Sequence, residues 1–159
     1  RRVALVSGIL HENGVMKKRF SGYQRALADY GIPYREEYLF EGNVDYDSGV
    51  SIAERISREK VDVTAVVAAA DIFAIGLMKG FYEEGIRVPE DISLISIDDS
   101  ELAELADTRL TSVHHPTDKL GARAAENLLA VMRNRSFDGN FEFVTEIVER
   151  DSVSGPAKA

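Results

Sequence analysis

The sequence has no cysteine, no long apolar run and fewer basic than acidic residues. The absence of cysteine excludes disulfides, thiolate metal sites and cysteine nucleophiles, and it is compatible with a reducing cytoplasm. No stretch approaches the roughly 18 consecutive apolar residues of a membrane-spanning helix. With 27 acidic and 19 basic residues the net charge is −8, and the basic residues are not clustered. We therefore do not expect this chain to grip nucleic acid by itself, because its surface repels phosphates.

What is present suffices for one domain with its own core, because the chain has 159 residues of which 45% are hydrophobic. The chain opens directly on a strand-like segment, Arg1 to Val6. This start favours a cut through a longer protein, so the lack of a signal peptide says little about the compartment.

Strand and helix signals alternate along the chain. Strands are expected at residues 2–7, 38–40, 63–69, 92–97, 110–115 and 141–148, and helices at residues 16–30, 46–60, 72–84 and 117–133. This alternation predicts an α/β fold with a doubly wound, parallel sheet. The run from Val63 to Ala69 agrees with it, because the run is apolar apart from Thr64 and parallel strands are buried on both faces.

The stretch from Ile92 to Ile97 reads as a buried strand that ends in an acidic pair, Asp98 and Asp99. Open α/β sheets bind ligands just past the carboxyl ends of their strands, which makes this pair the candidate site. Two other interpretations stay open. The carboxylates could favour the N-terminus of a short helix from Glu101 to Ala106, or they could hold a magnesium ion.

The sequence supports none of the common catalytic motifs. His114 and His115 lie on an extended segment and point to opposite faces, so they cannot share a metal ion. The chain has no Gly-x-Ser-x-Gly elbow, and Ser7-Gly8-Ile9 lacks the further glycines of a dinucleotide fingerprint. We expect no enzymatic activity, no metal and no cofactor.

The helix after Asp71 is apolar nearly all round. Such a helix is either wholly buried or has one face in a subunit interface, and the second is favoured in a chain of this size. We therefore expect Phe73, Leu77 and Phe81, with Leu102 of the next helical segment, at a dimer interface. Asp71 itself stands where a helix N-cap belongs.

Six stretches, in this order, resemble the C-terminal part of the lactose/galactose-repressor (LacI/GalR) family of bacterial transcription regulators: RRVALVSG, RFSGYQRAL, EGNVDYDSG, AAADIFAIGLMKGFYEEGIRVPEDISLISIDDS, LTSVHHPTDKLGARAAENLL and VERDS. The phrase VPEDISLISIDD followed by LTSVHHP is the most specific. Within the family, the chain is similar to the catabolite control proteins, through EGNVDYDSG and LTSV, and to ribose- and maltose-type repressors.

The resemblance implies the effector-binding and dimerisation core of a cytoplasmic regulator, with the two-lobed fold of type I periplasmic binding proteins and a DNA-binding headpiece ahead of this chain. Residues 1–109 and 138–153 would form the C-terminal lobe, residues 110–137 would cross into the N-terminal lobe, and residues 154–159 would be a tail. The apolar stripe of the last helix would then be exposed in this chain alone.

Two residues match ligand-binding positions of the family. Arg19 lies three residues before Gly22, where the family commonly has an arginine that hydrogen-bonds the hydroxyls of the effector. Asp98 matches the aspartate that accepts hydrogen bonds from sugar hydroxyls. On the residues alone, Arg19 would instead be a solvated charge on a surface helix.

Three further positions match less closely. The usual Asn-Asp pair before the interface helix is Ala70-Asp71 here, so the amide is lost and Asp71 remains. His115 replaces the usual glutamine before the crossover proline, and Asn13 lies in a loop that often touches the ligand. The resemblance thus places these residues around a sugar or sugar phosphate: Arg19, Asp98, His115, Asp71 and Asn13.

Family members that dock the phosphorylated carrier protein HPr use the helix matching Thr117 to Met132, with a tyrosine-aspartate start and an arginine two turns on. Aligned on Gly121, the start here is Asp118-Lys119 and the arginine position is Glu126. This charge reversal should repel a phosphoserine, so we expect no HPr docking.

A second function on the same fold is a periplasmic-type solute-capture protein for sugar transport. Capture proteins work as monomers, so they would carry a more polar helix after Asp71. The apolar helix therefore favours the regulator.

Overall fold

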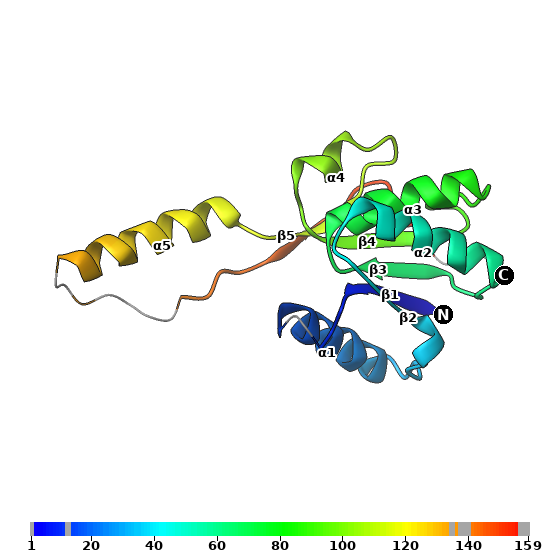
Figure 1. Cartoon of the computed structure of the whole chain (residues 1–159), viewed down its shortest axis with the longest axis horizontal. Coiled ribbons are helices and arrows are strands. Elements are labelled where there is room, and N and C mark those ends of the chain that lie inside the picture. Colours follow the sequence, from blue (N-terminus) through cyan, green and yellow to red (C-terminus); the bar gives the residue numbers. More distant parts are fainter. Residues whose placement is uncertain (1, 12–13, 134–135, 137–140, 156–159) are drawn as a thin grey trace.

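The computed structural model describes residues 2–11, 14–133, 136 and 141–155. Its six-stranded sheet has the order β2-β1-β3-β4-β5-β6, with β5 and β6 antiparallel and the other neighbours parallel. The α/β class and the mainly parallel sheet are confirmed (Figure 1). The strands are β1 Val3–Gly8, β2 Leu39–Gly42, β3 Ala65–Ala68, β4 Ser93–Asp98, β5 Thr111–His114 and β6 Glu146–Val148. The helices are α1 Gly14–Asp29, α2 Tyr46–Arg58, α3 Asp71–Glu83, α4 Glu101–Leu105 and α5 Thr117–Met132, with a 3-10 turn at Glu36–Tyr38.

Helices cover both faces of the sheet (Figure 1). On one face, Leu5 of β1 is buried with Tyr23 and Leu27 of α1. On the opposite face, α2 and α3 pack over a larger core that includes Phe40 and Phe73. Burial on both faces explains why the inner strands are nearly continuous apolar runs.

The two helices of the larger core meet at glycines. α2 begins where the Asp45 side chain accepts a hydrogen bond from Ser48 N–H at 2.8 Å, as an N-cap does. A Cβ atom built on Gly49 of α2 would lie 2.9 Å from the Cα atom of Gly76 in α3, a separation that real Cβ atoms essentially never show. Glycine at both positions therefore lets the two backbones approach this closely.

The dimer-interface prediction is wrong for three residues of α3. Phe73, Leu77 and Phe81 are each 0% exposed within the single chain. Their spacing of four places them on one face of the helix, and this face packs into the core. They cannot contact a second copy, whereas Leu102 of α4 is 43% exposed and remains accessible.

The outward face of α3 lines a groove of about 920 Å³. Ile75, Met78 and Tyr82 of α3 form one wall, and Leu105 at the end of α4 contributes to the other. Tyr82 and Leu105 are 78% and 77% exposed. The apolar character that the sequence shows around α3 therefore has an inner and an outer part.

The segment expected to leave the lobe at residue 110 leaves it later. Leu110 is fully buried, and β5 pairs in parallel with β4, so the sheet extends through His114. α5 then projects away from the sheet, and none of its residues is buried (Figure 1). The exposed stripe expected there is present, with Leu128 and Met132 61% and 71% exposed. The expected return at residues 137 and 138, and residues 156–159 of the tail, lie outside the described residues.

The closing segment after β6 completes the sheet between β4 and β5. Their pairing begins at Ile95 and Thr111, one residue after Leu94. There, the Ser152 hydroxyl accepts a hydrogen bond from Thr111 N–H at 2.8 Å and donates one to the Leu94 carbonyl at 2.6 Å. Leu94 N–H donates to the Ser152 carbonyl at 2.8 Å. Ser152, which is fully buried, thus fills the position where the two strands have not yet met.

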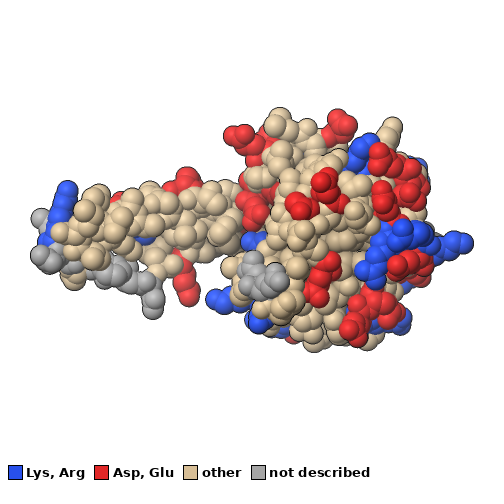
Figure 2. All heavy atoms as spheres, viewed as in Figure 1, with Lys and Arg blue, Asp and Glu red and all other residues tan. Residues whose placement is uncertain are grey.

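The surface shown in Figure 2 carries acidic and basic side chains side by side over the body of the molecule. The projecting α5 is mostly uncharged in this view, in agreement with its exposed apolar side chains. In the part of the chain that the structure describes, no helix is both long enough and apolar enough to cross a bilayer.

Candidate ligand-binding site

The candidate site lies at the carboxyl ends of the parallel strands, where Arg19 of α1 meets Asp98 of β4. Arg19 Nη2 donates a hydrogen bond to Asp98 Oδ1 at 3.2 Å. Arg19 Nη1 donates to the carbonyl oxygen of Ala69, the residue that follows β3. The structure thus brings together the two residues with the closest family match, although 79 positions separate them in the sequence.

The charges of this pair are partly shielded from water. The side chains of Arg19 and Asp98 are 19% and 37% exposed. Burial raises the pKa of the Asp98 carboxyl above its usual value, and the neighbouring Arg19 guanidinium partly offsets that rise. The pair therefore presents a carboxylate that accepts and a guanidinium that donates, in a position that water and a small molecule can reach.

The backbone is unusual where β4 ends. Asp98 and Asp99 have φ angles of +132° and +54°, in the region that favours glycine. Such conformations cost of the order of 1–3 kcal/mol each and persist only where neighbouring contacts hold them. Here Asp99 N–H donates to Ser112 Oγ at 3.1 Å, and His115 N–H donates to the Asp98 carbonyl at 3.3 Å. The turn sends the two neighbouring carboxylates in different directions.

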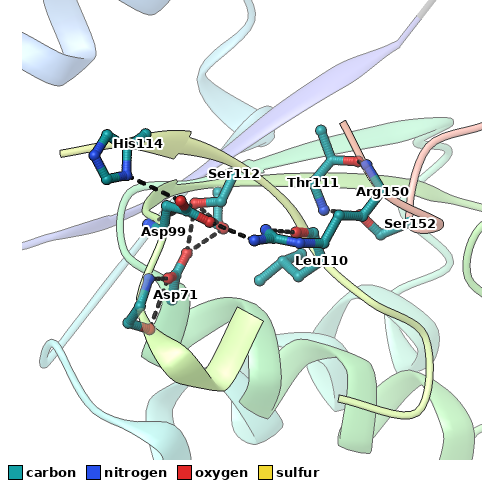
Figure 3. A network of polar contacts seen from close by, with 10 residues as sticks. Asp71, Asp99, Leu110, Thr111, Ser112, His114, Arg150 and Ser152 are labelled. Carbon is teal, nitrogen blue, oxygen red and sulfur yellow. Dashed lines mark hydrogen bonds and ion pairs between the residues drawn. The ribbon is translucent and has the colours of Figure 1, made fainter. Parts of the chain in front are cut away.

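Asp99 faces β5 and the closing segment (Figure 3). Its Oδ2 atom lies 3.0 Å from His114 Nδ1, and its Oδ1 atom lies 2.7 Å from Arg150 Nη2. Burial raises the pKa of this carboxyl, but the hydrogen bonds and charges of Arg150 and His114 outweigh burial, so its pKa falls below the usual value. Asp99 is therefore an ionised, internally paired group, not the start of α4.

Asp71 does not cap its own helix. α3 begins at Asp71, Ala70 occupies the N-cap position, and no side chain caps that end. The Asp71 carboxylate is 2% exposed and accepts from the Ser96 and Ser112 hydroxyls and from Ser100, whose N–H and hydroxyl donate at 2.6 and 2.7 Å. Each hydroxyl has one hydrogen, and both Ser96 and Ser112 direct it to the carboxylate. Their two oxygens lie 3.0 Å apart, and neither has a hydrogen left to donate to the other. Asp71 thus joins α3, β4, α4 and β5 internally.

The sequence reasoning missed this serine network, because Ser96 and Ser112 lie 25 and 41 positions from Asp71. The available signal was a small hydroxyl at a buried position inside each apolar strand. A buried hydroxyl needs a hydrogen-bond partner, so each of these serines indicates a polar group nearby in the core.

Of the two other expected site residues, His115 and Asn13, only His115 lies among the described residues. His115 is exposed beside Asp98, close enough for its charge to lower the pKa of the Asp98 carboxyl. Asn13 lies outside the described residues. Near that loop, Leu10 N–H donates to Glu41 Oε1 at 2.6 Å, which fixes the segment after β1 against the end of β2. Among the described residues, no group of three or more histidine, aspartate or glutamate side chains is arranged to hold a metal ion.

Known proteins match this chain over nearly its whole length. A family model for the periplasmic binding protein-like domain matches residues 1–153. The chain is 40% identical over 153 residues to the HTH-type transcriptional repressor PurR of Vibrio atlanticus, covering 96% of this chain and 46% of that protein. It is 34% identical over 140 residues to catabolite control protein A of Priestia megaterium, covering 88% and 42%. The chain thus spans about half the length of the curated relatives it matches.

Solved structures agree in fold. The transcription regulator CcpA of Lactococcus lactis has a TM-score of 0.88 at 33% identity, over 96% of this chain and 56% of that one. A complex of the transcriptional regulator CelR with cellobiose has a TM-score of 0.87 at 31% identity, over 96% and 46%. A dimeric lac repressor has a TM-score of 0.90 at 26% identity, over 98% and 56%.

Proposed function

Since the chain belongs to the periplasmic binding protein-like domain family, in the form found in LacI/GalR-family regulators, we propose that it is the effector-binding and dimerisation core of a bacterial transcription regulator. The observation that carries the proposal is the Arg19–Asp98 pair at the carboxyl edge of the sheet. In an open α/β sheet this edge is where ligands bind. The curated relatives named above are transcription regulators, which also supports a binding role rather than catalysis.

The ligand class that suits this pair is a polyhydroxylated one, a sugar or sugar phosphate. A carboxylate accepts hydrogen bonds from hydroxyls, and a guanidinium donates to hydroxyl or phosphate oxygens in a fixed geometry. His115 adds a third polar group beside Asp98. Asp71, with its carboxylate occupied by internal donors, acts in this proposal by positioning the ends of β4 and β5.

A purine base is the competing ligand, since one relative is named for a purine-type repressor and another regulator is solved with cellobiose. The two classes differ in what they need from the site. A sugar needs acceptors and donors around its rim, whereas a planar base needs a flat apolar surface above and below it. Arg19, Asp98 and His115 supply rim contacts, which favours the sugar.

The groove beside α3 is the proposed site of the second copy in a homodimer. Its lining includes the exposed Tyr82 and Leu105, and Leu102 of α4 is exposed as well. The similarity to a dimeric lac repressor supports the formation of a homodimer. Binding of the effector would then change operator binding through the shared interface. The operator itself would be contacted by a DNA-binding segment outside this chain.

α5 completes the proposal as the part that reaches a second lobe. Its exposed apolar side chains need a partner surface, and the lobe opposite the ligand site would supply it. We propose no docking of HPr on this helix, since Glu126 puts a negative charge where a phosphoserine would approach. A cytoplasmic location follows from the proposed role.

The test is a thermal-shift screen of the full-length protein against sugars, sugar phosphates and purine bases. A specific ligand at about 100 times its dissociation constant adds about 2.7 kcal/mol to stability, which is a clear shift. Stabilisation by a sugar or sugar phosphate is the expected result. Stabilisation by a purine alone would identify purines, not sugars, as the ligand class. A monomer that binds sugar without affecting DNA binding would favour the solute-capture function.

A further inference from the structure

Asp99 lies where the proposed ligand site meets both connections to α5. Its backbone follows Asp98 directly, while its carboxylate pairs with His114 and Arg150 (Figure 3). α5 lies between β5 and β6 in the sequence, so the chain reaches it past His114 and comes back toward Arg150. One carboxylate therefore holds the outgoing and the returning connection together.

The pairing is strong enough to matter because it is shielded from water. The side chains of Asp99 and Arg150 are 12% and 13% exposed. Breaking a buried ion pair by removing one partner leaves the other charge without compensation, which is strongly destabilising. Arg150 also donates to the Leu110 carbonyl at 2.8 Å, which fixes it to the start of β5.

The strained turn ties this pairing to Asp98. Asp98 and Asp99 both have positive φ, conformations that persist only where surrounding contacts hold them. Ser112 Oγ holds Asp99 N–H, and the Asp98 carbonyl accepts from His115 N–H. A change at the Asp98 carboxylate therefore shifts a peptide unit that β5 holds from two sides.

We propose that Asp99 is a positioning residue that directs Asp98 toward Arg19 and couples a change at that pair to both connections of α5. The link between this coupling and effector binding rests on the proposed function. The coupling itself is a property of the protein without ligand. A failed ligand screen would therefore remove the proposed function and leave the coupling to be judged separately.

The test measures amide hydrogen exchange of the full-length protein without ligand, in a double-variant design. Arg19→Ala removes the partner of Asp98, and we expect exchange to rise about fivefold or more at residues 113–117 and at residues 146–150. In an Asp99→Asn background the same Arg19→Ala change should leave both segments unaltered. A purely structural role of Asp99 predicts the opposite, namely that the two substitutions act additively.

Two further variants sharpen the result. In an Arg150→Gln background, Arg19→Ala should still raise exchange at residues 113–117 and no longer at residues 146–150. In an Asp151→Asn background, which breaks the exposed ion pair with Arg109 instead, both responses should persist. The proposal is overturned if Arg19→Ala has no effect on either segment of the otherwise unchanged protein, or the same effect with and without Asp99. If Asp99→Asn does not fold, the Arg150→Gln comparison decides alone.

Discussion

Gly49 of α2 and Gly76 of α3 touch through their backbones, and a Cβ atom on Gly76 would meet the carbonyl oxygen of Tyr46 and stand 2.9 Å from Gly49 Cα. This crossing lets α3 bury its inner stripe against the sheet. The contact leaves no side chain that could move aside, so relief of a larger residue requires the helices to separate.

Gly76→Ala should therefore destabilise the protein by about 1–3 kcal/mol or more, the usual cost of overpacking a core. Gly22→Ala is the matched control, because Gly22 lies within α1 with open space around it. There the substitution should stabilise by up to about 1 kcal/mol through helix propensity. Urea denaturation measures both; equal effects of the two variants would mean that the helices are not in close contact.

Ser152→Ala should cost about 1–3 kcal/mol, because Thr111 N–H and the Leu94 carbonyl would lose their buried partner. Ser154→Ala is the control, since its hydrogen bond to the Pro89 carbonyl is exposed and water can replace it. Equilibrium unfolding should separate the two variants clearly. A Ser152→Ala protein as stable as the parent would show that the closing segment does not complete the sheet.

Arg19→Ala and Asp98→Asn should each weaken effector binding by at least about tenfold, because each removes a charged hydrogen-bonding group from the proposed site. Calorimetry with the ligand found in the screen measures the loss. Arg109→Ala is the control, since it breaks an exposed ion pair with Asp151 and leaves the site untouched. Wild-type affinity in either site variant would remove that residue from the site.

Asp98 and Asp99 should affect the pH dependence of stability with opposite signs. The pKa of Asp99 is lowered, so its stabilising contribution is present above the usual aspartate pKa of about 4 and is lost as the pH falls through the lowered value. The pKa of Asp98 is raised, so its ionisation reduces stability as the pH rises from about 4 through the raised value.

Melting curves between pH 3 and 7 of the two Asn variants check these signs, in the range where aspartates titrate. Relative to the parent, Asp99→Asn should lose most stability near neutral pH and least in acid. Asp98→Asn should compare more favourably near neutral pH than in acid. Parallel profiles for the two variants would contradict the assigned environments.

Leu105→Glu should convert the proposed homodimer to a monomer, because it places a charge in the groove lined by Tyr82 and Met78. Light scattering on the purified full-length protein measures the oligomeric state. Tyr30→Glu, directly after α1, is the control, since Tyr30 is 79% exposed and α1 packs on the sheet face opposite α3, so the dimer should stay intact. A dimer that survives Leu105→Glu would place the interface elsewhere.

The layer architecture could be predicted from the sequence because hydrophobic periodicity reports local structure directly. The apolar run of Val63 to Ala69 indicated a doubly covered strand, and β3 lies between β1 and β4 as such a strand must. The approach of Arg19 to Asp98 was expected through family resemblance, since no local pattern links residues 79 positions apart.

Other features escaped because they depend on tertiary contacts. The apolar composition of α3 does not indicate which face of the helix is buried. Phe73, Leu77 and Phe81 were therefore assigned to the outside, although they face the core. The N-cap expectation for Asp71 used only its place before a helix, whereas its partners come from β4, α4 and β5. Aspartate occurs at positive φ more often than most other residues, but nothing local in the sequence distinguishes Asp98 and Asp99 from aspartates with negative φ.

Ser152 has a consequence for the order in which the protein can be completed during synthesis. Its partner Leu94 is made 58 residues earlier, and the whole of α5 is made in between. A nascent chain that has reached His114 can assemble five strands but leaves Thr111 N–H and the Leu94 carbonyl open to solvent. The hydrogen bond between Ser152 and Leu94 therefore cannot form until all of α5 and β6 has been synthesised.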